Sequence, residues 1–360
     1  MDKRIILAVA GSGKTHYIAN DFEEKQRVLL ISFTNSNVNN IKKELVNRFG
    51  EVDFKNILYM TFDSFVLNFL VKPMETEYPI LKGQRSEGIN IVDIPVDDSR
   101  KPKYIKIDDK RHYMDANNKL YIYRISKLFN KQSSGLKKRI VQRISMFFDA
   151  IYFDEFQDYK ANDFKAMKYV FEKVECKVEA VGDIFQSQLT PTREFTSNGE
   201  FPFKIINCKE DLQKHFKRIE IVDNLLDKSR RVSPEVCEFI RKNLNIDIYS
   251  DLENALNGKI KFLSSLEDID KIMKDKTIPK LIWNKTVAHV NGENFINWSY
   301  SKGDTYKQTC VILTKNLDQL EKWQSISGKT KNGLYVALTR AETNVYIIKD
   351  TDYKKWKKEQ

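Results

Sequence analysis

A glycine-containing loop near the N-terminus has the residue types that bind nucleotide phosphates. The letters AVAGSGKT, residues 8–15, follow a short apolar run and precede a pattern typical of a helix. Glycines let backbone N–H groups converge on a phosphate, and the helix that follows turns its positive end toward it. In such loops the lysine reaches the β- and γ-phosphates, and the next hydroxyl residue binds Mg²⁺. We predict that the nucleotide is bound by Ala10, Gly11, Ser12, Gly13, Lys14 and Thr15, with Thr15 also a ligand of Mg²⁺.

Two further polar segments follow apolar runs later in the chain. Asp154 and Glu155 come directly after the letters AIYF, and Gln186 lies a few residues after the next apolar run. We predict that Asp154 binds Mg²⁺, directly or through water, and that Glu155 orients and deprotonates an attacking water. Gln186 is placed to sense the γ-phosphate. Each segment taken alone also fits an ordinary solvated turn after a strand, so that alternative stays open for each.

The spacing of apolar residues predicts the elements that position these segments. Short apolar runs alternate with helical patterns, which favours a parallel sheet covered on both faces. The predicted strands are 5–9, 27–33, 57–61, 150–153 and 177–181, followed later by 259–263, 281–283, 309–313 and 345–349. Prolines and charges interrupt this rhythm from about 69 to 138, which we interpret as an insertion projecting from the first sheet. Ser233 and Pro234 predict the start of a helix that runs through Arg241.

Composition sets broader bounds. A chain of 360 residues fits two medium-sized domains. The net charge of +11 is a weak indication of a polyanionic partner, and a basic surface without a specific role is an equally common alternative. Neither the four cysteines nor the four histidines are spaced as metal ligands. No apolar stretch could span a membrane, so we expect a cytoplasmic protein with no membrane partner. The basic tail 354–358 is predicted to be a frayed end.

The order of these motifs resembles the UvrD/Rep family of superfamily 1 helicases. The letters SFTN at 32–35 are similar to the family's first DNA-contact motif, and TFDSF at 61–65 is similar to its second, with Asp63 where histidine is usual. The resemblance assigns nucleic-acid contacts to Thr34, Asn35, Thr61, Phe62 and Ser64.

Three later segments extend the resemblance. The letters LDKSRRVSPEVCEFI at 226–240 resemble the motif whose arginine reaches the γ-phosphate, and the register gives that role to Arg231. The segment 301–305 resembles the fifth motif, in which Gly303 and Thr305 would contact the nucleotide. The letters YVALTRA at 335–341 match the last motif, so Arg340 would be the arginine finger that stabilises charge on the transferred phosphoryl group.

The resemblance implies an α/β fold of two RecA-like P-loop NTPase domains with parallel sheets. The first domain would span 1–222, with an insertion at about 69–145, and the second 223–360. ATP and Mg²⁺ would bind between the domains, and closure on the nucleotide would move a single strand of DNA stepwise. RNA is the alternative strand, because the superfamily includes RNA-acting members.

Several positions depart from the family pattern. Ala8 stands where the strict loop has glycine, and the glutamine segment that reads adenine does not precede it, which leaves GTP open as the nucleotide. Arg230 stands where an aromatic usually stacks on the base. Residues 188–193 lack the aromatics that stack nucleic-acid bases in the family. Candidate substitutes are Phe62, Phe65 and Trp298, although aromatics in such runs are more often core residues.

Two functions of different classes follow. The first is an ATP-dependent helicase or translocase on single-stranded DNA, which the basic charge and the two DNA-contact motifs favour. The second is a nucleotide-dependent switch that controls a partner such as a nuclease, with little unwinding of its own. The missing stacking aromatics favour the switch, as does the segment 242–295, which is too short for the family's second accessory domain. Architecture alone suggests the helicase-like subunit of a bacterial antiphage or repair system.

Overall fold

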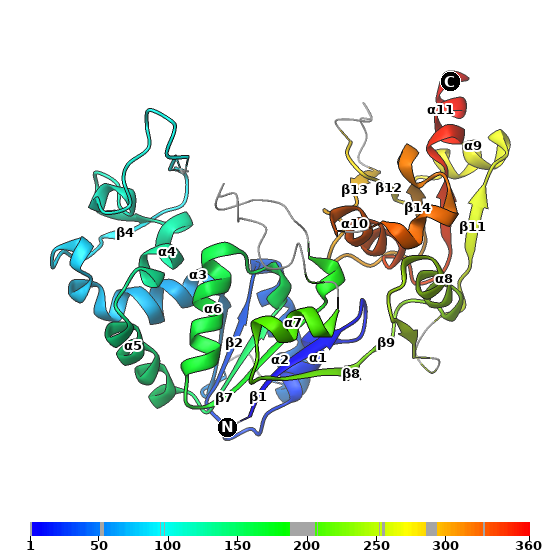
Figure 1. The fold of residues 1–360 in the computed structure, drawn as a ribbon. Coiled ribbons are helices and arrows are strands. Elements are labelled where there is room, and N and C mark those ends of the chain that lie inside the picture. Colours follow the sequence, from blue (N-terminus) through cyan, green and yellow to red (C-terminus); the bar gives the residue numbers. More distant parts are fainter. Residues whose placement is uncertain are drawn as a thin grey trace. The chain divides into compact units, whose positions relative to one another are not determined.

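The computed structural model describes residues 2–50, 54–93, 95–96, 98–187, 206, 208–251, 253, 256–285, 294–326 and 328–360. It confirms the predicted α/β fold with parallel sheets (Figure 1). The chain divides into two compact units. The first unit comprises Met1–Ile6, Lys14–Gly182 and Leu189–Val222. The second unit comprises Leu7–Gly13, Asp183–Gln188 and Asp223–Gln360.

A six-stranded sheet in the order β3-β2-β6-β7-β1-β8 organises the first part of the chain. Its strands are β1 (Lys3–Ala8), β2 (Val28–Ser32), β3 (Ile57–Thr61), β6 (Ala150–Asp154), β7 (Lys177–Gly182) and β8 (Glu220–Leu226). β2 pairs in parallel with β3 and β6, and β6 pairs in parallel with β7. Every residue of β2 and of β6 is buried, as expected of central strands covered on both faces. The carboxyl ends of these parallel strands therefore meet at one edge of the sheet.

Helices of the first unit cover this sheet and build the insertion (Figure 1). They are α1 (Lys14–Asn20), α2 (Asn35–Phe49), α3 (Phe62–Phe65), α4 (Ile125–Asn130), α5 (Ser134–Phe147), α6 (Ala161–Lys173) and α7 (Lys209–His215). α1 and α2 contact each other and the sheet. Between β3 and β6 the chain also forms a short parallel pair, β4 (Gly88–Asn90) with β5 (Lys119–Tyr121), which the apolar pattern did not predict.

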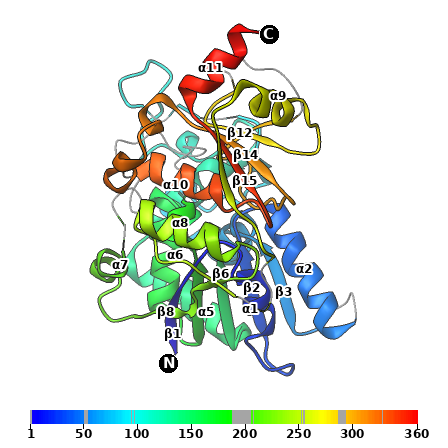
Figure 2. The same ribbon diagram turned by 90° about the vertical axis from the view of Figure 1, so that its right-hand side faces the viewer.

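The second unit contains a five-stranded parallel sheet in the order β11-β15-β14-β12-β13 (Figure 2). The strands are β11 (Ile260–Leu263), β12 (Lys280–Ile282), β13 (Phe295–Asn297), β14 (Thr309–Ile312) and β15 (Val345–Ile348), and a separate pair joins β9 (Lys228–Ser229) with β10 (Tyr249–Ser250). The helices are α8 (Pro234–Leu244), α9 (Leu266–Lys274), α10 (Gly328–Leu338) and α11 (Asp350–Lys358). Val311 belongs to one apolar core, while Cys310 and Ile312 belong to another, so apolar side chains cover both faces of β14.

Helix α8 begins at Pro234, as the sequence predicted, but its predicted cap works differently. Ser233 occupies the N-cap position without a capping side-chain hydrogen bond. Its hydroxyl instead donates to the carbonyl of Gly258, at 2.9 Å. The serine therefore ties the start of α8 to the chain that leads into β11.

The prediction of a frayed C-terminal tail is wrong. Residues 354–358 form the second half of helix α11. Tyr353 is buried, and Trp356 packs against the same apolar core that contains Ile269 and Ile272 of α9. The indole Nε1 of Trp356 also donates to Asp270 at 3.1 Å. Two aromatics three residues apart lie on one face of a helix, so the polar tail carries a narrow apolar stripe.

Two features are absent from the described residues. No helix among them is long and apolar enough to cross a lipid bilayer. Nor do they contain three or more histidine, cysteine or carboxylate side chains grouped as a metal site would require.

The packing of α11 predicts a stability effect at the tail. Trp356→Ala should lower the free energy of unfolding by about 1–3 kcal/mol, because it removes a half-buried ring from the α9–α11 core. Lys358→Ala, at an exposed position of the same helix, should change it by less than about 0.5 kcal/mol. Urea unfolding followed by circular dichroism measures both variants. Equal stabilities would mean that the tail is frayed after all.

Candidate nucleotide site

The glycine loop is shaped by close packing as well as by its backbone. Gly11 and Gly13 have φ values of 74° and 85°, in the region that favours glycine. A Cβ on Gly11 would lie 2.7 Å from Ser229 Oγ and 2.9 Å from Arg231 Cβ, closer than such atoms approach. The carbonyl of Gly11 also accepts from the Arg230 N–H at 2.9 Å. The residue at position 11 must therefore be small, because the segment that carries Arg231 packs directly against it.

The carboxylates at the end of β6 form a cluster with the loop lysine. The Lys14 ammonium lies 3.5 Å from Glu155 Oε1, and both side chains are mostly buried. Asp154 is fully buried, and the Ser32 hydroxyl donates to its Oδ2 at 2.9 Å. Burial, followed by the charge of Glu155, raises the pKa of Asp154 to about 7, while Lys14 and Ser32 act in the opposite direction. Ser32 thus supports Asp154, a role that the sequence motif alone did not suggest.

The donor set at Asp154 fits a magnesium ion. Its Oδ1 is buried and has no hydrogen-bond partner among the described residues. A buried unpaired carboxylate oxygen is costly unless a proton or a cation satisfies it. Oxygen ligands are those that Mg²⁺ prefers, with water completing its shell. Asp154 and the partly buried Thr15 hydroxyl would hold the ion, which would neutralise phosphate charge there.

The backbone at Glu155 is held in an unusual conformation. Its φ is 52°, in the left-handed region that non-glycine residues rarely adopt. The side-chain amide of Gln157 donates to Glu155 Oε2. Gln157 is itself pressed against Gly182, because a Cβ there would lie 2.1 Å from Gln157 Oε1. The orientation of Glu155 therefore depends on a glycine at the end of the neighbouring strand β7.

Tyr335 joins three motifs inside the second unit. Its hydroxyl accepts from the Ala10 N–H at 2.9 Å and donates to Asp183 Oδ2 at 3.0 Å. Asp183 Oδ2 also accepts from the Gln186 amide at 2.8 Å. Burial raises the pKa of Tyr335 far above its usual value, so the hydroxyl remains a donor. The motif pattern did not predict a role for Tyr335, although this residue is the first letter of the last motif.

The two arginines lie near each other in the second unit. Burial, and next the positive charge of Arg340, lower the pKa of Arg231 to about 9. Its Nε is buried without a hydrogen-bond partner among the described residues, and its Nη1 donates to Thr305 Oγ1 at 2.9 Å. Arg340 is almost fully buried, and its Nε donates to the Val336 carbonyl at 2.9 Å. Crowded guanidinium groups of this kind favour an anion beside them.

The other candidate residues of the segments 226–240 and 301–305 are more exposed. Gly303 is exposed with a φ of 92°, and nothing lies within 4 Å of the position a Cβ would take. Thr305 is exposed apart from its bond to Arg231. Arg230, which stands where an aromatic is usual, is exposed with its Nε 3.9 Å from Asp251 Oδ2.

Four of the predicted nucleic-acid contacts lie at the carboxyl edge of the first sheet. Thr34 and Thr61 follow or end the neighbouring strands β2 and β3, where Ser32 pairs with Thr61. Each threonine caps a helix, because Thr34 Oγ1 accepts from the Asn37 N–H and Thr61 Oγ1 from the Ser64 N–H. Thr34 and Asn35 are exposed, whereas Thr61 and Ser64 are half-buried. These side chains share one edge and can contact a single ligand.

The aromatic candidates for base stacking lie in the interior. Phe62 is 1% exposed and packs on Tyr159, with ring centroids 4.5 Å apart. Phe65 and Trp298 are equally buried. A base cannot stack on a ring that has no free face, so we assign Phe62 a supporting role under α3. Residues 188–193, where the family has its aromatics, lie outside the described residues.

A glycine loop after β1, with its lysine beside carboxylates at the end of β6, is typical of P-loop nucleoside triphosphatases. Residues 2–93 match the family model described as the UvrD/REP helicase N-terminal domain. The match over this region confirms the resemblance to the UvrD/Rep family that was drawn from the motifs.

Solved structures of helicases also match the chain. The Arterivirus nonstructural protein 10 helicase is 13% identical with a TM-score of 0.46, covering 96% of this chain and 59% of its own. The PRRSV helicase is 12% identical with a TM-score of 0.46, covering 97% of this chain and 52% of its own. A complex of the Arterivirus helicase with DNA matches similarly, at 13% identity and a TM-score of 0.46, covering 97% and 61%. The chain thus spans between half and two thirds of these proteins. No curated protein matches it.

The contact between Gly182 and Gln157 predicts a sensitive position. Gly182→Ala should lower nucleotide turnover and destabilise the fold by about 1–3 kcal/mol, because the new methyl group must displace Gln157 and the ring of Phe156. Gly135→Ala is the matched control, since nothing lies within 4 Å of that position in helix α5. Thermal unfolding and steady-state hydrolysis of both variants test this. Wild-type behaviour of Gly182→Ala would contradict the packing described.

The network around Tyr335 predicts an effect on turnover. Tyr335→Phe removes the acceptor of the Ala10 N–H and a donor to Asp183, leaving buried polar groups unpaired. We expect kcat to fall about tenfold, with a smaller change in KM, because the loop and Gln186 lose a shared anchor. Tyr353→Phe is the control, since Tyr353 is also buried but its hydroxyl makes no hydrogen bond within the described ranges. Equal kinetics for the two variants would remove the positioning role.

Proposed function

We propose that the protein is an ATP-dependent helicase or translocase that acts on single-stranded DNA. The observation that carries the proposal is the cluster of Lys14, Glu155 and Asp154. The aspartate is buried and accepts from Ser32, and its Oδ1 has no hydrogen-bond partner among the residues that the structure describes. These are the groups that nucleotide hydrolysis requires, and the UvrD/REP match covers Lys14 and Ser32.

The roles of these residues follow from their charges. Lys14 and the loop amides bind the phosphates, and Thr15 and Asp154 hold Mg²⁺. The γ-phosphate competes with Glu155 for Lys14, so nucleotide binding frees the carboxylate to take a proton from water. Mg²⁺ contributes charge neutralisation at the phosphates.

Residues of the second unit would act on the same phosphates. We propose that Arg231 and Arg340 stabilise the charge that develops on the transferred group, and that Gln186 senses the γ-phosphate. Arg231, with its lowered pKa and unpaired Nε, would gain most from an anion. Gly303 and Thr305 would contact the nucleotide beside it.

Single-stranded DNA would bind along the edge that carries Thr34, Asn35, Thr61 and Ser64. The net charge of +11 supports a polyanionic partner. The resemblance of residues 335–341 to the last motif of the UvrD/Rep family favours DNA over RNA as the strand. We place the protein in the cytoplasm, in a bacterial antiphage or repair system.

A second candidate is a nucleotide-dependent switch that controls a partner such as a nuclease. The burial of Phe62, Phe65 and Trp298 favours it, because none of these rings can stack a base. In this case hydrolysis would proceed independently of nucleic acid, and the partner protein would be the regulated component.

Steady-state hydrolysis separates these functions. Wild-type ATPase activity should rise with single-stranded DNA more than with single-stranded RNA or duplex. Glu155→Gln should retain nucleotide binding and lose about 10²–10⁴ in turnover, because it lacks the general base. Glu24→Gln is the control, because it changes an exposed carboxylate that is distant from Glu155 in sequence.

Each outcome has a consequence. Normal turnover by Glu155→Gln would show that another group activates water. Wild-type hydrolysis that no nucleic acid stimulates would replace the translocase by the switch, and a GTPase rate above the ATPase rate would change the nucleotide.

A further inference from the structure

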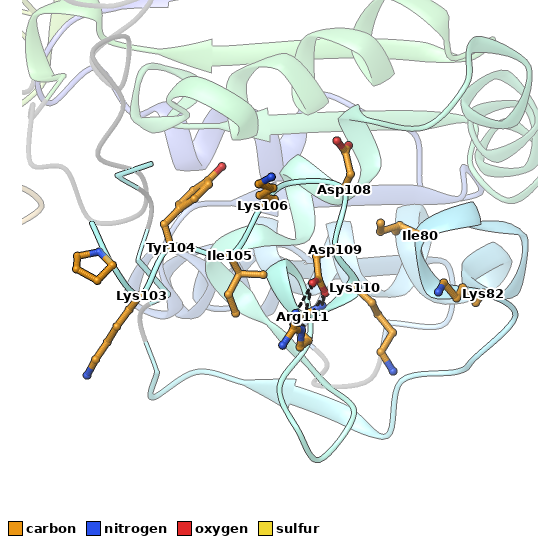
Figure 3. A pocket seen from close by; sticks show the side chains of 11 residues that line it. Ile80, Lys82, Lys103, Tyr104, Ile105, Lys106, Asp108, Asp109, Lys110 and Arg111 are labelled. Carbon is orange, nitrogen blue, oxygen red and sulfur yellow. Dashed lines mark hydrogen bonds and ion pairs between the residues drawn. The ribbon is translucent and has the colours of Figure 1, made fainter. Parts of the chain in front are cut away.

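A basic pocket lies in the insertion, away from the carboxylate cluster in sequence. Its volume is about 740 Å³. Figure 3 shows Lys82 and Lys103 on opposite sides of it, with Arg111 between them. Its charged lining residues are Lys82, Lys103, Lys106, Lys110, Arg111, Asp108 and Asp109. The lining therefore carries an excess of three positive charges.

Most of this positive charge is not neutralised within the insertion. Asp109 is committed to Arg111, whose Nη2 lies 2.6 Å from its Oδ2, and this contact lowers the pKa of Asp109 to about 2. The ammonium of Lys110 donates to the side-chain oxygens of Gln84 and Asn118. The side chains of the other three lysines make no ion pair or hydrogen bond within the described part of the chain, and each is exposed. They are Lys82, Lys103 and Lys106. An unpaired cluster of ammonium groups around a cavity attracts a polyanion.

The shape and lining of the pocket select among polyanions. Lys82 and Lys103 come from opposite sides of the lining, and the Lys103 side chain points outward, away from the other labelled residues (Figure 3). An extended strand with repeated phosphates can reach both lysines, whereas a small ion between them cannot. The half-buried ring of Tyr104, beside Pro102, offers a surface for a base or sugar. The rings of Tyr104 and His112 pack in a T-shaped arrangement, with their centroids 5.8 Å apart. An acidic polypeptide would use the charges but not the ring.

We propose that this insertion pocket binds the sugar–phosphate backbone of a nucleic-acid strand, in addition to the edge that carries Thr34 and Thr61. The proposal rests on the proposed action on nucleic acid and adds a second point of contact. Lys82, Lys103 and Lys106 contact phosphates, and Tyr104 contacts a base or sugar. The pocket is lined by none of the residues proposed to bind or hydrolyse the nucleotide.

The test removes three charges and counts the lost phosphate contacts. The variant Lys82→Gln/Lys103→Gln/Lys106→Gln is compared with Lys25→Gln/Lys55→Gln/Lys173→Gln, which removes three exposed lysines of the same unit outside the insertion. Binding of a labelled single-stranded oligonucleotide is measured by fluorescence anisotropy over a range of salt concentrations. The pocket variant should bind about tenfold more weakly, and its log Kd–log[salt] slope should fall by about 2, since each contact to a single strand contributes about 0.7.

Two further measurements, hydrolysis without nucleic acid and binding to poly-glutamate, complete the test. Hydrolysis without nucleic acid should be the same in both variants and in wild type, which shows that the fold and the nucleotide site are intact. If wild type binds the oligonucleotide and both variants bind it equally, the pocket proposal is overturned while the proposed function stands. If wild type binds no oligonucleotide, the pocket proposal and the proposed function both fail. If the pocket variant loses binding to poly-glutamate but keeps the oligonucleotide, the occupant is an acidic protein and the proposal is again overturned.

Discussion

The first unit depends on the burial of ionisable side chains at the carboxyl edge of its parallel sheet. An unpaired buried charge costs several kcal/mol, so Asp154 is tolerable only with compensation. Ser32 supplies a hydrogen bond, and Lys14 supplies a charge that also satisfies Glu155. These groups come from β2, β6 and the loop after β1, and only the meeting of strand ends at one edge assembles them. The compensation is incomplete, and the remaining buried oxygen is where a cation gains most.

In the second unit, the uncharged side chain of Tyr335 pairs with buried polar groups. Tyr335 lies fully buried between an N–H of the glycine loop and the carboxylate of Asp183, and it satisfies both through one hydroxyl. Asp183 in turn holds Gln186, so the loop and the glutamine share an anchor. Arg231 is left with a buried unpaired nitrogen and a lowered pKa. Each unit therefore has a buried polar atom without a hydrogen-bond partner among the described residues, Asp154 Oδ1 in the first and Arg231 Nε in the second. A cation would satisfy the carboxylate oxygen, and a phosphate would satisfy the guanidinium nitrogen.

The sequence predicted most strands of both sheets because central parallel strands are continuous apolar runs, as in β2 and β6. It did not predict β13 or the β4–β5 pair, because these strands (FIN, GIN and KLY) contain no run of three apolar residues, whereas residues 281–283 (LIW) do. Motif spacing located Lys14 and Asp154, but the support from Ser32 and Tyr335 depends on contacts between residues more than 100 positions apart. The helical tail was missed because its apolar stripe consists of only two aromatics, which bury themselves on α9.

The buried aromatics change how a strand could be held. With Phe62 and Phe65 in the interior, neither ring can stack a base at the edge of the first sheet, and charge must supply more of the affinity there. Stacking has to be broken whenever a base advances, at about 1–3 kcal/mol per base. Phosphates are equivalent in every register, so a strand held by lysines can move by one nucleotide without losing its contacts, as proteins that slide on DNA do. A largely electrostatic grip is therefore compatible with translocation, so the burial of these described rings does not exclude it.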